Sequence, residues 1–197
     1  GITLKKAREI AEEMQRVNGI RDLMAFLGSF GVRPEDAVKV WKAYGADSIA
    51  CIQEDPYRLC SEQIAVDFAV ADKLAESLEY DRANAERVKA GVLYVLRHNL
   101  LNGHTCLPAD KLCAAAAQLL GVPLEDAQAA LYALCRDFDA VCENFNGRDF
   151  IFLPKQHRCE VYSADRIHMM LRYPPEPIVG VDREIEEIER SEGIRYA

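Results

Sequence analysis

The chain has 197 residues, of which 50% are hydrophobic and 28% are charged, so its composition excludes intrinsic disorder and allows one or two folded domains. Its 32 acidic residues outnumber its 24 basic ones and give a net charge of -8, which excludes a protein that wraps nucleic acid over its whole surface. Any nucleic-acid contact is therefore expected to be local. No apolar run approaches the roughly 18 residues that span a bilayer, so we expect no membrane partner.

The first 80 residues repeat one pattern three times. Each copy reads glycine, an aliphatic residue, four variable residues, alanine, two further residues and a second aliphatic residue; the copies begin at Gly1, Gly31 and Ala65, and the third has lost the glycine. The glycine–aliphatic pair suits a tight turn, and the small alanine lets the following helix pack closely against its neighbour. The pattern predicts tandem helix–hairpin–helix units over residues 1–80.

The hairpins of such units present backbone N–H groups and a helix N-terminus, which can hold a DNA phosphate without reading sequence. The candidate DNA-binding residues lie in the first two copies and are Gly1, Ile2, Thr3, Lys5, Lys6, Gly31, Val32 and Arg33. A second interpretation, helical repeats that only stack on each other, explains the same spacing.

The charged residues near each hairpin favour one or the other of these two interpretations to a different degree in each copy. In the first copy the cations Lys5, Lys6 and Arg8 leave both open. In the second, Glu35 and Asp36 offset the basic residues and favour a scaffold slightly. In the third copy Ala65 and Asp67 replace the residues that would leave N–H groups open, and the scaffold is clearly favoured.

From residue 81 onward the pattern predicts three helices, over 84–101, 108–120 and 124–139, with a short extended stretch at 104–107. Asn146-Gly147-Arg148 then separates two apolar runs, 141–145 and 149–153, which is a strong hairpin signal. This order predicts a winged-helix-like domain with a small β-hairpin over residues 81–173. The chain is therefore expected to be mainly α.

The third helix of a winged-helix domain commonly enters a major groove of DNA. Here its segment carries four acidic residues against Arg136 alone, so phosphates would repel it. We expect the wing to serve packing or protein contact, with Arg148 and Lys155 as lesser candidates for a phosphate contact.

The C-terminal residues are predicted to lead towards another domain. A helix over 160–172 ends at a proline cluster, 173–177, and a charged helix follows over 182–190. We interpret residues 174–197 as a linker. Because Gly1 lies inside a repeat and no methionine precedes it, the chain is expected to be a fragment of a longer protein.

The seven cysteines are scattered and odd in number, which is typical of a reducing cytoplasm rather than of a disulfide framework. None has C-x-x-C spacing, and His104-Thr105-Cys106 and His157-Arg158-Cys159 are isolated, so we expect no metal and no cofactor in this chain. No cysteine–histidine pair has a recognisable catalytic setting, so no catalytic residue is expected.

Several ordered blocks carry a family resemblance: 26–32, 39–45, 55–59, 89–96 and 103–108, which include Ser29-Phe30-Gly31-Val32 and Asp55-Pro56-Tyr57-Arg58-Leu59. With their intervals, these blocks resemble the N-terminal, non-motor region of RecD-like ATP-dependent DNA helicases (RecD/TraA family, exodeoxyribonuclease V alpha-like), over essentially the whole chain. One block departs from the family, because relatives have a Gly-Ile-Gly-Phe hairpin where this chain has Ala65-Val66-Asp67-Phe68. DNA contact by the third hairpin is therefore not expected.

The resemblance implies a bacterial DNA repair or recombination helicase whose motor domains use ATP and magnesium and travel along single-stranded DNA from five-prime to three-prime. The chain itself has no G-x-x-x-x-G-K-[ST] phosphate loop, so we expect no ATP hydrolysis by it. Two functions follow as hypotheses. The first is an accessory module that places single-stranded or forked DNA for the motor domains of the same chain. The alternative is a scaffold that docks on the motor or on a protein partner without touching DNA.

Overall fold

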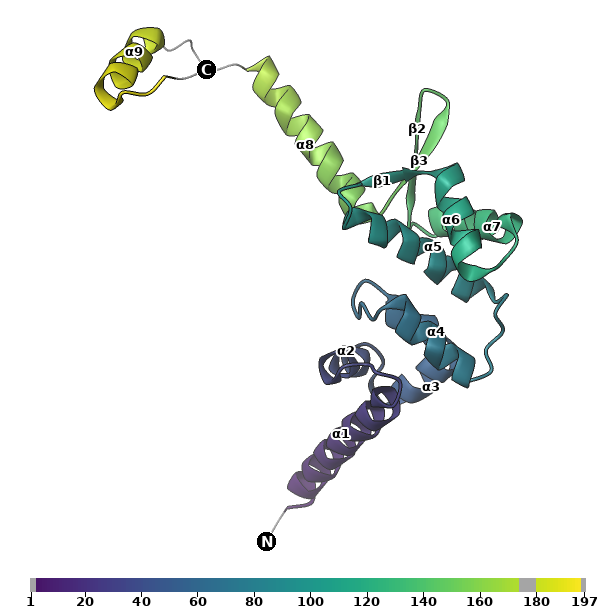
Figure 1. Cartoon of the computed structure of the whole chain (residues 1–197). Helices are drawn as coiled ribbons and strands as arrows, with labels where there is room; N and C mark the ends of the chain where they lie inside the picture. The colour runs from purple at the N-terminus through teal and green to yellow at the C-terminus, as the bar shows by residue number, and fades with distance from the viewer. Residues whose placement is uncertain (1–2, 174–179, 196–197) are drawn as a thin grey trace. The chain divides into compact units, whose positions relative to one another are not determined.

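The computed structural model describes residues 3–173 and 180–195 and is mainly helical, as predicted (Figure 1). The chain divides into two compact units, Gly1–His157 and Arg158–Ala197. In the described residues no helix is both long and apolar enough to cross a membrane.

The first part of the larger unit consists of helices and two short 3-10 turns: α1 (Leu4–Gly28), α2 (Pro34–Tyr44), η1 (Gly45–Asp47), α3 (Ser48–Glu54), η2 (Pro56–Cys60) and α4 (Phe68–Ser77). Thr3 begins α1, because its hydroxyl accepts a hydrogen bond from the Lys6 N–H at 3.4 Å. Only the C-terminal half of α1 enters the core, through Leu23 and Leu27, which pack with α2.

The second and third copies of the repeat form two hairpins that share two backbone features. Gly31 and Ala65 both have a positive φ, of 88° and 60°. After each turn a buried valine N–H donates to a leucine carbonyl of the preceding arm, Val32 to Leu27 at 3.2 Å and Val66 to Leu59 at 3.0 Å. In the third copy that arm is the 3-10 turn η2 rather than the α-helix of the expected unit.

The second part of the unit has the predicted order: α5 (Ala85–Leu100), β1 (Cys106–Pro108), α6 (Ala109–Leu120), α7 (Leu124–Arg136), β2 (Val141–Phe145) and β3 (Arg148–Phe152). The strands form an antiparallel sheet in the order β1-β3-β2. Helix α7 ends three residues before the predicted residue 139, and the chain turns at Phe138, whose φ is +64°. Apart from this boundary, the order of helices and strands is the one predicted for residues 81–153.

Residues on both sides of position 80 belong to one hydrophobic core, which extends from Leu23 in α1 to Ile151 in β3. The side chain of Arg97 in α5 also donates to the carbonyl of Cys60 in η2. The helix–hairpin–helix part and the winged-helix-like part are therefore packed together within the Gly1–His157 unit.

Two helices follow the sheet, α8 (Pro154–Arg172) and α9 (Val181–Glu192). Helix α8 begins six residues before the predicted start at 160, because Pro154 is tolerated in a first helical turn. Helix α9 is the charged helix predicted over 182–190. The prolines of the predicted cluster lie outside the described residues.

Candidate nucleic-acid interface

The second hairpin, residues 29–33, connects α1 to α2 and contains three of the predicted DNA-binding residues. An added Cβ at Gly31 would meet no atom within 4 Å, so this glycine is required by its positive φ rather than by close packing. The N–H groups of Gly31 and Val32 already donate to Gly28 and Leu27. Among the described residues, the N–H groups of Arg33 and Glu35 make no hydrogen bond, so they are the donors that an anion could use there.

The cations of this hairpin are paired with carboxylates. Arg33 lies 2.8 Å from Glu35 through Nη1 and 3.0 Å from Asp36 through Nε. Lys39 lies 2.7 Å from Asp36 and donates to the carbonyl of Ile64 at 3.2 Å, which links the second hairpin to the third. Any phosphate at this hairpin must therefore compete with two carboxylates.

Asp36 is 3% exposed and stays ionised between these two cations. Burial acts to raise its pKa, but the hydrogen bonds from Lys39 and Arg33 outweigh burial and lower the pKa below its ordinary value. The Arg33 side chain remains 65% exposed, so its guanidinium can still reach a ligand in solution.

The third hairpin has a carboxylate where the second has Arg33. Asp67 caps α4 by accepting a hydrogen bond from the Ala69 N–H at 2.8 Å. An incoming phosphate would need that N–H group and would be repelled by the Asp67 charge. The loss of glycine is visible as Ala65 in the left-handed region, where a side chain is strained.

The first copy of the repeat is described only from Thr3 onward, and its Gly1 and Ile2 lie outside the described residues. Lys5, Lys6 and Arg8 are exposed on the first two turns of α1. Within the described part of the chain these three cations form no ion pair, in contrast to Arg33. Among the predicted DNA-binding residues, Lys5 and Lys6 are therefore the least neutralised cations.

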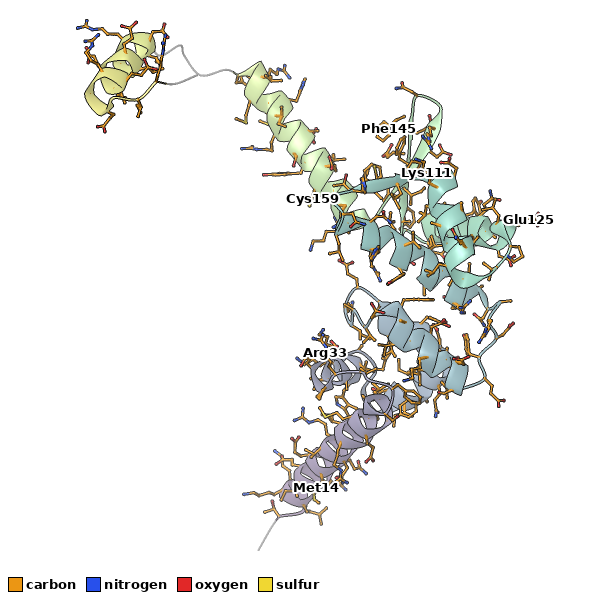
Figure 2. The ribbon with its side chains drawn as sticks, viewed as in Figure 1. Met14, Arg33, Lys111, Glu125, Phe145 and Cys159 are labelled. Atoms are coloured by element: carbon orange, nitrogen blue, oxygen red, sulfur yellow. The ribbon has the colours of Figure 1, made fainter. Side chains whose placement is uncertain are left out.

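The structure does not bring the two predicted sites together. Thr3 and Gly31 flank opposite ends of α1, whose 25 residues make it about 37 Å long. In Figure 2 Arg33 lies at the α1–α2 hairpin, whereas Met14 marks the half of α1 that leads away from it. A single phosphate cannot bridge these sites, so each would contact a different stretch of nucleic acid.

The winged-helix-like part has few uncompensated cations. Arg148 at the start of β3 lies 3.1 Å from Asp110 and stacks over the Phe150 ring. Arg136, the single cation of the predicted third-helix segment, pairs with Asp137 at 2.9 Å. Lys155 forms no ion pair among the described residues. Arg136 and Arg148 are thus both paired with carboxylates.

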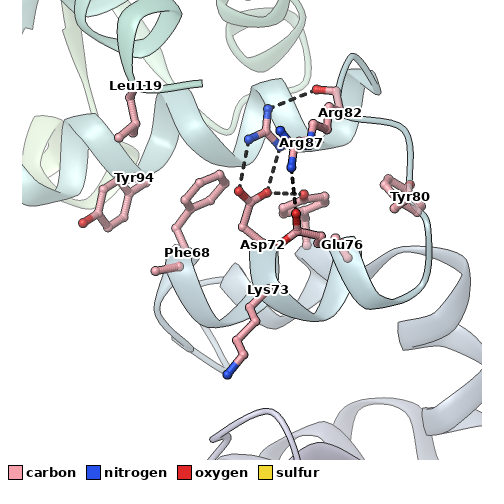
Figure 3. Close-up of a pocket in the computed structure, with 12 residues that line it drawn as sticks. Phe68, Asp72, Lys73, Glu76, Tyr80, Arg82, Arg87, Tyr94 and Leu119 are labelled. Carbon is pink, nitrogen blue, oxygen red and sulfur yellow. Dashed lines mark hydrogen bonds and ion pairs between the residues drawn. The ribbon is translucent and has the colours of Figure 1, made fainter. Parts of the chain in front are cut away.

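Sequence reasoning missed a pocket of about 390 Å³ between α4 and α5 (Figure 3). Its lining includes aromatic rings and an ion pair that is only partly exposed: Tyr57, Phe68, Tyr80, Tyr94, Asp72 and Arg87. The Tyr57 hydroxyl donates to Asp72 at 2.6 Å, and burial together with that carboxylate raises the pKa of Tyr57. No sequence signal could have found this cluster, because Asp72 and Arg87 are neither neighbours nor members of one helix.

Residues 16–106 match the family described as the ATP-dependent RecD2 DNA helicase HHH domain. The matched residues begin within α1 and end at the first residue of β1, so they contain the second and third hairpins, α4 and α5. They do not include Lys5 or Lys6. The match supports the resemblance of this region to the N-terminal region of a RecD-like helicase.

Proposed function

We propose that this chain is an accessory DNA-binding module of an ATP-dependent DNA helicase, which holds backbone phosphates without reading sequence. The observation that carries the proposal is the match of residues 16–106 to a helicase HHH domain. In the two hairpins within this range, a valine N–H after a residue of positive φ donates to a leucine carbonyl of the preceding arm. In this proposal, motor domains that use ATP and magnesium belong to the same polypeptide. They act in DNA repair or recombination in the cytoplasm and travel from five-prime to three-prime.

Two places are proposed to contact DNA. One is the beginning of α1, with Gly1, Ile2, Thr3, Lys5 and Lys6, where the cations are not paired in the described residues. The other is the second hairpin, with Gly31, Val32 and Arg33, and the N–H groups that begin α2. Their separation along α1 suits a strand that lies across the module, single-stranded or at a fork.

A salt-dependent titration with single-stranded and forked DNA tests this function. Wild-type chain is expected to bind weakly, with an affinity that falls steeply as salt rises. Lys5→Glu with Lys6→Glu should weaken binding, and a double variant with the same charge change at Lys42 and Lys111 serves as control. Equal DNA affinities of the two double variants would show that the beginning of α1 is not a DNA-binding site.

The second hairpin is tested in the same titration by Glu35→Gln. This substitution removes one of the two carboxylates that neutralise Arg33, so a phosphate contact there should strengthen and the binding constant should rise by a few-fold. Glu86→Gln, which removes the partner of Lys89 in α5, is the matched control. If both variants gain equally, the effect is general charge and the hairpin makes no contact.

The alternative function, a scaffold that docks on the motor domains or a protein partner, is favoured by the charge pairing itself. Asp67 occupies the N-terminal N–H of α4, and Arg33 is bound by two carboxylates. This function requires that the chain bind separately produced motor domains in a pull-down and bind no DNA at low salt. If the chain binds DNA but does not bind the motor domains, the scaffold function is excluded.

A further inference from the structure

The pocket between α4 and α5 is lined by four aromatic rings and belongs to neither of the two proposed DNA contacts. Its volume of about 390 Å³ falls within the range of roughly 300–1,000 Å³ that is usual for sites of small organic ligands. Tyr57 stacks on Phe68 with the ring centroids 5.8 Å apart, and Phe68 lies 5.5 Å from Tyr94. Tyr80 meets Tyr57 edge to face at 5.9 Å. Such a lining suits a flat aromatic ring as ligand.

The ionic groups of the pocket are already engaged, whereas two of its tyrosine hydroxyls are not. Arg87 and the Tyr57 hydroxyl both donate to the carboxylate of Asp72, so these groups hold α4 and η2 to α5. The hydroxyls of Tyr80 and Tyr94 make no hydrogen bond within the described residues, and both side chains are partly exposed. Figure 3 shows these two tyrosines on opposite sides of the Asp72–Arg87 pair. Each hydroxyl can therefore donate to, or accept from, a polar edge of a bound ring.

The charges around the pocket favour a ligand that carries a negative charge beside its ring. In a chain whose net charge is -8, the lining has three cations against two carboxylates. Lys73 forms no ion pair in the described part of the chain. Arg82 pairs with Glu76 at 2.7 Å, but both side chains are mostly exposed, so an anion can replace this contact at little cost. Lys73 and Arg82 are therefore available to an anionic group next to the rings.

We propose that this pocket accepts an unpaired nucleobase, which stacks on the aromatic rings while Lys73 and Arg82 contact the adjoining phosphate. Every nucleobase has a flat face for stacking and a polar edge for hydrogen bonds, so the site needs no particular sequence. In a duplex the bases are stacked and paired, so only a single strand or an extruded base can enter. The inference rests on the proposed function and deepens it, because the hairpins contact phosphates alone whereas this pocket selects single-stranded DNA.

Two oligonucleotides separate base binding from phosphate binding. One is a single-stranded oligothymidylate, and the other has the same length and the same phosphates but no bases. Fluorescence anisotropy of the labelled oligonucleotides measures their affinities, and the wild-type chain should bind the one with bases about tenfold more tightly. Tyr94→Leu keeps the apolar bulk but removes the aromatic ring and its hydroxyl, so it should reduce this ratio to about twofold. Tyr132→Leu, the same substitution at an α7 tyrosine that is 73% exposed, should keep the wild-type ratio.

The outcomes separate the pocket from the proposed function. Equal affinity of the wild type for the two oligonucleotides would overturn the pocket assignment and leave the phosphate contacts of the hairpins unaffected. A preference for bases that persists in Tyr94→Leu would place the base elsewhere and would also overturn it; Tyr80→Leu serves in its place if circular dichroism shows that Tyr94→Leu does not fold. Isothermal titration with thymidine monophosphate tests a free nucleotide as the ligand. If this nucleotide binds and neither oligonucleotide does, the pocket chemistry holds and the proposed function fails, whereas binding of none of the three would overturn both.

Discussion

Arg87 of α5 donates two hydrogen bonds to the carboxylate of Asp72 in α4, from Nε at 2.8 Å and from Nη2 at 3.0 Å (Figure 3). Its third nitrogen, Nη1, donates to the carbonyls of Arg82 and Leu120 at 3.0 and 3.2 Å. The side chain of Arg87 is 10% exposed. One guanidinium thus joins the helix–hairpin–helix part to both α5 and the end of α6, in a fork geometry that lysine cannot reproduce.

Replacement of Arg87 by alanine should lower the free energy of unfolding by about 3 kcal/mol, because Asp72 keeps its charge in a partly buried place without its cation. Urea unfolding followed by circular dichroism measures the change. Arg82→Ala removes a surface pair with Glu76, whose two side chains are mostly exposed, and should leave stability almost unchanged. Equal losses in the two variants would show that the Arg87–Asp72 contact does not hold the two parts together.

The same contact predicts a loss of stability at low pH. Burial acts to raise the pKa of Asp72, but the hydrogen bonds from Arg87 and Tyr57 outweigh burial and lower the pKa below its ordinary value of 3.8. A lowered pKa in the folded state stabilises the protein above pH 3.8, and this contribution is lost as the pH falls through the folded-state value. The stability difference between wild type and Asp72→Asn should therefore shrink from pH 6 to pH 2.5, as thermal unfolding across the series would show. A difference that stays constant over that range would contradict this assignment.

Gly19 in α1 is predicted to be intolerant of alanine even though it lies inside a helix. An added Cβ would lie 2.8 Å from Cζ3 of Trp41 in α2, so the ring would have to move. Alanine has a helix propensity roughly 1 kcal/mol more favourable than glycine. The steric cost of displacing the ring exceeds this gain, so Gly19→Ala should lower the free energy of unfolding by about 1 kcal/mol.

Trp41 is the only tryptophan of the chain, so its fluorescence reports the displacement directly. Gly28→Ala, at a helical glycine with no atom within 4 Å of the added Cβ, is the control and should be neutral or stabilising. Gly19→Ala with unchanged emission and higher stability would show that α1 and α2 do not approach this closely.

Ala65 offers a stabilising substitution in the third hairpin. Its φ of +60° costs about 1 kcal/mol with a side chain and almost nothing with glycine. Ala65→Gly should therefore raise the melting temperature by a few degrees. Ala83→Gly, at an exposed turn residue whose φ is not positive, should lower it slightly. Differential scanning calorimetry should therefore show a higher melting temperature for Ala65→Gly and a lower one for Ala83→Gly than for the wild type.

Much of the local structure could be predicted from residue patterns, because caps, turns and helix periodicity act over a few residues. Thr3 begins α1, Asn146-Gly147 forms the β2–β3 turn, and the apolar spacing from Leu124 places α7. The boundaries that differed were those where a turn competed with the helix, as at Phe138, or where proline was accepted in a first turn, as at Pro154.

Residue patterns could predict only part of the candidate site. The repeat identified Gly31 and the position of Ala65 as turn residues, because a glycine in a repeated pattern indicates a backbone with positive φ. It could not show that Lys39 of the second unit reaches the carbonyl of Ile64, or that about 35 Å of helix separates Lys5 from the second hairpin. Those relationships depend on how long a helix continues and which segments it meets.

By itself, the sequence determined that this protein is a helical, acidic chain with a repeated hairpin and a small sheet, because composition and periodicity carry that information directly. Tertiary structure alone decided that Arg87 joins α4, α5 and α6 around Asp72, and that Ile10 and Met14 in the first half of α1 are exposed. The physical reason is the same for both. Hydrogen-bond pairing and burial are relations between surfaces brought together by folding, and no spacing along the chain encodes which surfaces will meet.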